Sequence, residues 1–187
     1  PKLLRKFAVP SVISLLVNAL YNIVDQIFIG RGVGYLGNGA TNVILPLVVM
    51  NMAICMLFGD GAATFFSVKL GEKKEDQACH AVGNAIVGGL ITGLITCTVF
   101  NAGLQFFCRL TGSTDNIMPY ALEYGHIIVS AFPAVALIVV TSSIIRADGS
   151  PRFTMAGLLV GCGINVILDY LFVIRFQWGV KGAAWAT

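Results

Sequence analysis

Charged side chains are scarce in this sequence, since only 11% of its 187 residues are Asp, Glu, Lys or Arg. A soluble domain usually carries about 25% charged residues. The hydrophobic share of 57% and the mean hydropathy of +0.84 agree with that shortage. The composition excludes an ordinary soluble domain and predicts an integral membrane protein. The net charge of +3 is small and scattered along the chain, so we predict no nucleic-acid partner.

Motifs for catalysis and metal binding are absent as well. The sequence contains no GxSxG, HExxH or P-loop motif, so we predict that the protein is not an enzyme. Its five cysteines show no CxxC or metal-ligand spacing, which favours small buried hydrophobic residues. The string GVGYLG from Gly32 to Gly37 matches a dinucleotide fingerprint, but a full membrane span precedes it instead of a short strand. We therefore predict no cofactor and no structural metal.

Long apolar segments, separated by polar turns, make up most of the chain. A helix needs about 20 apolar residues to cross a bilayer. We predict an all-α polytopic membrane helix bundle with five full transmembrane helices and the start of a sixth. The predicted helices cover about residues 7–29, 41–70, 78–107, 117–145, 153–174 and 182–187. Because the last six residues cannot span a bilayer, we expect the chain to be a fragment.

Glycine and proline punctuate these predicted spans. Pro46 is a candidate kink in the second span, and Pro133 lies at mid-depth in the fourth. Two GxxxG pairs, at residues 89 and 93 and at residues 157 and 161, would permit close helix contact. Asp60 lies between two glycines near one end of the second span, where we expect it to be solvated.

The first predicted span contains a carboxylate. Asn18, Tyr21, Asn22 and Asp25 follow the spacing i, i+3, i+4, i+7, so they share one face of a helix. A charged group within hydrocarbon costs about 2.5–3.5 kcal/mol, and it normally faces a bundle interior or a watery cavity. The stripe either joins helices by hydrogen bonds or lines a functional cavity, and for Asp25 we favour function. Asn51, in the middle of the second span, either lines a cavity or bonds a neighbouring backbone.

The basic residues predict the orientation of the chain, because cytoplasmic loops carry an excess of Lys and Arg. One side of the membrane collects eight of them and the other side four. The larger set contains Lys2, Arg5, Lys6, Lys69, Lys73, Lys74, Arg146 and Arg152, and the smaller set contains Arg31, Arg109, Arg175 and Lys181. We therefore predict a multi-pass protein of the cell membrane with a cytoplasmic N-terminus.

Four oxygen-bearing residues are predicted to share one depth in the outer leaflet. Asp25, Asp169 and Thr187 each lie six residues from the basic residue at the outer end of their helix. At about 1.5 Å per residue, each is roughly 9 Å below the outer boundary. Asn165 is one turn from Asp169 on the same helix face. Such a hard, oxygen-rich set suits H⁺ or Na⁺ better than a soft metal.

Several strings in the chain resemble one family of transporters. They are PSVISLLVNALYNIVDQIFIG at residues 10–30, GDGAATFFSVKLGE at 59–72, IRADGSPRFTM at 145–155, NVILD at 165–169 and GVKGAAWAT at 179–187. In this order they cover most of the chain, which is similar to the first half of the multidrug and toxic compound extrusion (MATE) transporters.

The resemblance implies twelve helices in two six-helix bundles around a central cavity, with export driven by an inward H⁺ or Na⁺ gradient. This chain, residues 1–187, would be the N-terminal bundle without most of its sixth helix. Its partners would be the C-terminal bundle of the same protein, membrane lipid and an organic small-molecule substrate.

The resemblance also implies roles for particular residues. The family's N-terminal cation or proton site matches Asp25, Asn165, Asp169 and Thr187, the set that the depth argument selects. Tyr21 matches a position that lines the same pocket.

We expect Asn18, Tyr21, Asn22 and Asn51 to line the substrate cavity. The sequence thus predicts a cation-coupled antiporter that exports organic, often cationic, drugs or metabolites. Burial and a second nearby carboxylate both disfavour ionised acids, so binding of a proton or Na⁺ would relieve the repulsion.

Two alternative functions remain open. A lipid-linked oligosaccharide flippase of related fold would share the architecture, but it would be expected to line its cavity with arginines, and this chain has no mid-span arginine. A non-transporting membrane scaffold subunit would explain the GxxxG pairs, but it would not require two acids at matched depth.

Overall fold

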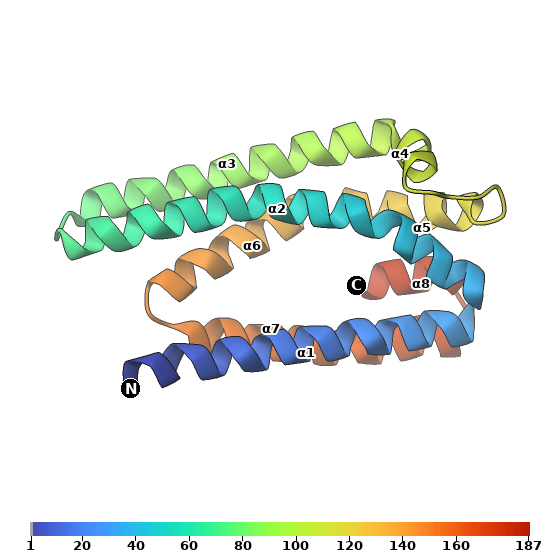
Figure 1. Cartoon of the computed structure of the whole chain (residues 1–187), viewed down its shortest axis with the longest axis horizontal. Helices are drawn as coiled ribbons and strands as arrows, with labels where there is room; N and C mark the ends of the chain where they lie inside the picture. Colours follow the sequence, from blue (N-terminus) through green and yellow to red (C-terminus); the bar gives the residue numbers. More distant parts are fainter. Residues whose placement is uncertain (1) are drawn as a thin grey trace.

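The computed structural model describes residues 2–187, with side chains described from Val12 onward. Pro1 and the side chains of the predicted basic flank up to Lys6 lie outside the described residues. The chain is all α-helical (Figure 1). The elements are α1 (Lys2–Gly32), α2 (Tyr35–Gly71), α3 (Glu75–Ala102), α4 (Leu104–Leu110), α5 (Met118–Ser130), α6 (Phe132–Ala147), α7 (Pro151–Asp169), the π-helix η1 (Tyr170–Arg175) and α8 (Gly179–Ala186).

The predicted fold class, an all-α polytopic membrane bundle, is confirmed. Four segments of the described chain are long and apolar enough to cross a membrane, and the bent pair α5 and α6 makes a fifth candidate. Large hydrophobic side chains lie exposed along the outer faces of α1, α3 and α7, among them Leu15, Ile95 and Ile167. Such surfaces suit a lipid environment.

The fourth predicted span, residues 117–145, is broken in the structure. α5 ends at Ser130 and α6 begins at Phe132, with a bend of 49° between them. Pro133 explains the break, because it has no N–H to donate to the carbonyl four residues earlier. At the break itself, the N–H of Ala131 approaches two carbonyls, that of Ile127 at 3.3 Å and that of Ile128 at 3.1 Å. Pro46, by contrast, lies inside α2, which continues through it.

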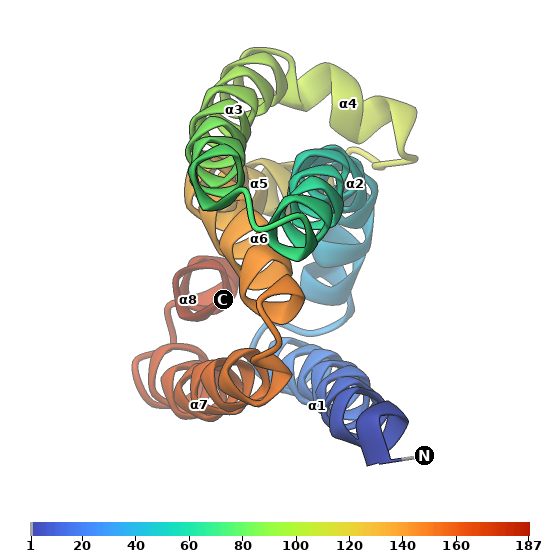
Figure 2. The same cartoon turned by 90° about the vertical axis from the view of Figure 1, so that its left-hand side faces the viewer.

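The other predicted boundaries differ by smaller amounts. The third span, predicted to reach residue 107, stops at Ala102, because Gly103 leaves the helical conformation and α4 turns away from α3 (Figure 2). The second span, predicted from residue 41, starts at Tyr35, directly after Gly34 with its φ of 88°. The last helix starts at Gly179 and not at residue 182.

The helices form two layers joined by α5 and α8. α2, α3 and α6 pack against one another, while α1 and α7 lie side by side and run in the same direction (Figures 1 and 2). Gly93 lets α3 approach α6 closely, since a Cβ there would lie 2.8 Å from the Cα of Pro133. The second GxxxG pair behaves differently, because no atom lies within 4 Å of a Cβ built at Gly157 or Gly161.

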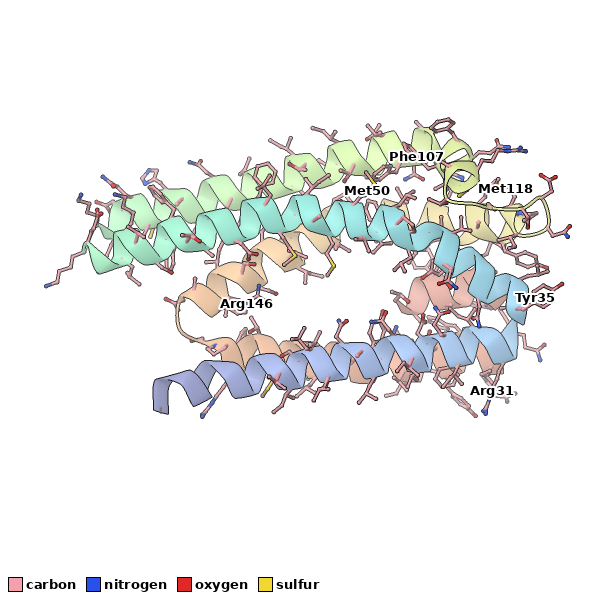
Figure 3. The ribbon with its side chains drawn as sticks, viewed as in Figure 1. Arg31, Tyr35, Met50, Phe107, Met118 and Arg146 are labelled. Carbon is pink, nitrogen blue, oxygen red and sulfur yellow. The ribbon has the colours of Figure 1, made fainter. Side chains whose placement is uncertain are left out.

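A hydrophobic core fills the end of the bundle that contains α4 and η1. Its fully buried members include Ile29, Leu104, Phe132 and Val173. The ring of Phe100 packs edge-on against that of Phe132, with centroids 6.0 Å apart. Met118, which belongs to this core, lies at the same end of the bundle as Arg31 and Tyr35 (Figure 3).

Candidate functional site

The predicted ion-site residues converge inside the bundle. Asp25 projects from α1, Asn165 and Asp169 project from α7, and Thr187 follows the last residue of α8. The two carboxyls and the amide are buried, with Asp25 7% exposed, Asn165 6% and Asp169 0%. The parallel packing of α1 against α7 places the two acids at the same level. Burial of two acids in a membrane span requires partners for their oxygen atoms.

The carboxyls of Asp25 and Asp169 face each other within hydrogen-bonding reach. Ionised carboxylates only accept hydrogen bonds, so no donor lies between them. Accordingly, Oδ1 of Asp25 and both carboxyl oxygens of Asp169 are buried without a hydrogen-bond partner. A single proton on either acid would supply the missing donor, and a cation would satisfy both.

Asn165 contributes a further free acceptor. Its Nδ2 donates to the backbone carbonyl of Ala186 at 3.0 Å, which ties α7 to the end of α8. This contact uses the donor side of the amide, and Oδ1 is buried without a partner. The Thr187 hydroxyl donates to the carbonyl of Ala183 at 3.1 Å, so its lone pairs stay available. The site thus gathers oxygen acceptors from three helices.

Two tyrosines border these acceptors. Tyr21 from α1 lies close to both acids and to Thr187. Tyr124 from α5 is only 8% exposed and lies close to the same residues. The sequence analysis did not select Tyr124. It could have been noticed as a tyrosine within a predicted membrane span, because a buried tyrosine hydroxyl usually has a polar partner.

The turn between α7 and α8 returns the chain to the level of the acids. The π-helix η1 starts directly after Asp169, and π-turns are frequent at functional sites. The rings of Phe172 and Trp178 then stack with centroids 4.9 Å apart. Gly182 contacts the backbone of Phe172, where a Cβ would lie 3.0 Å from its carbonyl carbon. These contacts fix the direction of α8 and therefore the position of Thr187.

An ion pair holds α8 from the other side. Lys181 Nζ on α8 lies 2.7 Å from Oε1 of Glu123 on α5. Glu123 immediately precedes Tyr124, so the ion pair and the tyrosine both help to position α5 relative to α8. Asp60 is exposed, as we expected, and it also accepts a hydrogen bond from Ser143 at 2.8 Å, which ties α2 to α6.

The residues predicted to line one substrate cavity are divided among three places. Asn18 and Tyr21 line a cavity of about 650 Å³ between α1, α6 and α7, together with Asn165 and Thr187. The glycines at residues 157 and 161 also line it, which explains why they lack packing partners. The ion site therefore opens onto this cavity.

Asn22 and Asn51 lie elsewhere. Asn22 lines a separate groove with Gln26 and Asn38, and its Nδ2 donates to the backbone oxygen of Asn18 at 2.7 Å, within α1. Asn51 is 1% exposed and accepts a hydrogen bond from Thr96 of α3 at 2.7 Å. The structure thus makes Asn51 a contact between two helices and does not bring it to the cavity.

The chain is similar along its whole length to known transport proteins. Residues 10–171 match the MatE family. The multidrug export protein MepA of Staphylococcus aureus (strain MSSA476) is 29% identical over 186 residues, covering 100% of this chain and 41% of that protein. MepA of Staphylococcus saprophyticus subsp. saprophyticus is 29% identical over 185 residues, covering 97% of this chain and 40% of that protein.

Solved structures share the fold. The MATE multidrug transporter DinF-BH superimposes on the chain with a TM-score of 0.93 and 32% sequence identity, covering 100% of this chain and 42% of that one. The chain therefore spans about two fifths of the length of the curated relatives that it matches.

Proposed function

Since the chain belongs to the MatE family of multidrug and toxic compound extrusion transporters, we propose that it forms the N-terminal bundle of a cation-coupled antiporter. The relatives that it matches are named multidrug export proteins, and they are more than twice as long. The missing length would supply a second bundle that closes the transport path. The exported substrates would be organic small molecules, by analogy with the multidrug transporter DinF-BH and the multidrug export protein MepA.

The group of buried oxygens without donors supports coupling to a cation. Asp25, Asn165 and Asp169 together present four such atoms, and Thr187 adds a hydroxyl beside them. In a membrane interior, unsatisfied acceptors and paired carboxylates are strongly disfavoured. A proton shared by the acids, or a Na⁺ ion bound by carboxylate, amide and hydroxyl oxygens, would satisfy them.

Binding of the ion would act on the arrangement of three helices. The oxygens come from α1, α7 and the end of α8, so a bound cation draws these helices together, and its release lets the acids repel each other. An ion shifts a conformational equilibrium only by its differential affinity for the two states. We propose that this difference biases the bundle between its inward-open and outward-open arrangements.

The substrate path would run along the polar face of α1 and α2. Asn22 and Asn42 are exposed there, Gln26 is half-exposed, and the groove beside them measures about 540 Å³. Exposed amides at membrane depth suit a water-filled cavity and not lipid. A continuation of α8 beyond Thr187 would enter the 650 Å³ cavity (Figure 1), which leaves the α1–α2 face for substrate.

The orientation follows from the basic residues. We propose that the end carrying Arg146 faces the cytoplasm and that the end carrying Arg31 faces outward, because Lys and Arg are more numerous at the first of these ends (Figure 3). The coupling site then lies in the outer half of the bundle.

The flippase alternative finds less support. An arginine-lined cavity would suit the anionic groups of a lipid-linked sugar, yet no arginine lines any of the three cavities described in residues 12–187. The scaffold alternative leaves the four orphan acceptors without a role.

Ion-dependent efflux tests the proposed function. The full-length protein in proteoliposomes should export a fluorescent organic cation when an inward H⁺ or Na⁺ gradient is imposed. A steep response to pH with no response to Na⁺ would assign H⁺, and the reverse would assign Na⁺. Equal efflux with and without either gradient would contradict coupling.

A further inference from the structure

A separate cavity of about 810 Å³ lies between α2 and α3, close to the turn that joins them. We call it the hairpin groove, and its members used below are Phe58, Gly61, Phe65, Asp76, His80 and Asn84. The α2–α3 turn extends beyond the α6–α7 loop, at the end of the bundle opposite η1 (Figure 1). The groove therefore lies at the membrane boundary, away from the acid pair.

The two walls of the hairpin groove differ in chemistry. On α2, Phe58 and Phe65 are two turns apart and are 38% and 47% exposed, which is high for aromatic side chains. On α3, Asp76, His80 and Asn84 follow the spacing i, i+4, i+8 and form one polar stripe. An aromatic wall that faces a polar wall suits an amphiphilic guest.

The charge of the groove selects a cation. Among the residues that the structure describes, Asp76 is the only acidic one that lines the groove, and no lysine or arginine lines it. Of the nearby lysines, Lys69 and Lys74 lie 2.9 Å and 3.0 Å from Glu72, outside the groove, and Lys73 does not line the groove. Lys69 also lies 5.4 Å from the centroid of the Phe65 ring, so one face of that ring already holds a cation.

We propose that the hairpin groove is a binding site for lipophilic organic cations. Asp76 would pair with the positive charge, while Phe58 and the free face of Phe65 would contact the apolar rings of the guest. The volume falls in the range of about 300–1,000 Å³ that is typical of small-molecule sites. This inference rests on the proposed function and extends it, because the groove would collect transport substrates at the cytoplasmic membrane boundary before they reach the cavity.

The Gly59-Asp60-Gly61 step gains an explanation from this site. Gly59 faces α6, where a Cβ would lie 3.2 Å from the Cα of Val140. Gly61 has no atom within 4 Å of a built Cβ and borders the groove, so its missing side chain leaves room for a guest. Gly59 thus allows close packing against α6, whereas Gly61 leaves space in the groove. A larger side chain at Gly61 would not clash with the protein.

A pair of ions with the same shape and opposite charge tests the proposal. Tetraphenylphosphonium and tetraphenylborate would be titrated into the purified protein in detergent, with empty micelles subtracted. The wild type should bind the phosphonium more tightly than the borate. Asp76→Asn should weaken phosphonium binding about two- to fivefold, as expected for a partly exposed ion pair. Gly61→Trp should remove the part of this binding that occurs in the groove.

Gly83→Trp is the matched control, because Gly83 also has no atom within 4 Å of a built Cβ but does not line the groove. It should bind the phosphonium like the wild type. Equal affinity for the two ions, or a phosphonium titration that neither Gly61→Trp nor Asp76→Asn changes, would overturn the proposal. So would retention of a phospholipid in the groove, detected by native mass spectrometry and lost in Gly61→Trp.

A second comparison separates this site from the coupling site. Asp169→Asn should leave groove binding unchanged, and a loss of phosphonium binding in this variant would place the probe at the acid pair instead. Because the titration uses no gradient, its result does not depend on efflux. Intact groove binding in a wild-type protein that shows no gradient-driven efflux would contradict the proposed function and keep the site.

Discussion

The substitution Asp169→Asn separates ion coupling from a purely structural role of the acid pair. Asparagine has the shape of a protonated aspartic acid and carries its own donor, so its amide can bond the carboxyl of Asp25 directly. The buried acceptors of Asp169 then need no ion. We therefore expect the variant to fold and insert, and to behave as if the proton were permanently bound.

The structure indicates how large each effect should be. If Asp169 only joins helices, the change corresponds to one membrane hydrogen bond, about 0.6 kcal/mol, or about a threefold change in an equilibrium constant. If Asp169 binds and releases the coupling ion, gradient-driven efflux should fall at least about tenfold while the thermal midpoint stays near the wild-type value. Asp25→Asn should act alike, and the double variant should be little worse than either single variant, because both acids belong to one site.

Proteoliposomes with a defined pH or Na⁺ step provide the assay, and exchange of labelled substrate without a gradient provides the control. The variants should lose the response to the gradient while they keep part of the exchange. Wild-type efflux in both single variants, at equal amounts of reconstituted protein, would remove these acids from the mechanism.

Four further outcomes are expected. Gly93→Leu should lower the free energy of unfolding by about 1–3 kcal/mol, because its side chain would meet the backbone of α6, whereas Gly157→Leu faces open space and should change thermal unfolding little. Lys181→Met should lose the ion pair with Glu123 and cost about 0.2–1 kcal/mol, a difference that should shrink in high salt. Hydrogen bonds from two neighbouring lysines lower the pKa of Glu72, so this contact should hold the α2–α3 turn fully above about pH 4.3 and be lost as the pH falls through the lowered value, which hydrogen exchange of the turn would report. Residues 1–187 expressed alone should show no gradient-driven efflux, and measurable efflux would contradict the need for a second bundle.

Depth along a helix could be read from the sequence, because basic residues mark the outer helix ends and the rise per residue is fixed. That argument selected Asp25, Asn165, Asp169 and Thr187, and the structure brings them together. Tyr124 was missed because it approaches the site from a helix that the depth argument did not include. Its place depends on how α5 packs, which no local pattern reports.

Breaks and contacts between helices were less predictable. Pro133 was noted in the fourth span, but a proline in a membrane helix can be tolerated, as Pro46 is in α2, so the 49° bend needed the structure. In the sequence, Asn51 is a polar residue inside an apolar span, which is also typical of a residue that lines a cavity. Only its hydrogen bond with Thr96 shows that it joins two helices instead. The sequence specifies which residues are polar, whereas packing decides which polar atoms meet.

The π-helix after Asp169 affects how this region can vary among related proteins. A π-turn amounts to one residue inserted into an α-helix. Deleting one residue between 170 and 175 would restore a regular helix and turn all that follows by about 100° relative to α7. Thr187 would then leave the acids although neither acid had changed. In an alignment of related chains, a one-residue gap between residues 170 and 175 would therefore mark those that keep both aspartates but have lost the Thr187 hydroxyl beside them. Chimaeras joined within this stretch would have to preserve its length.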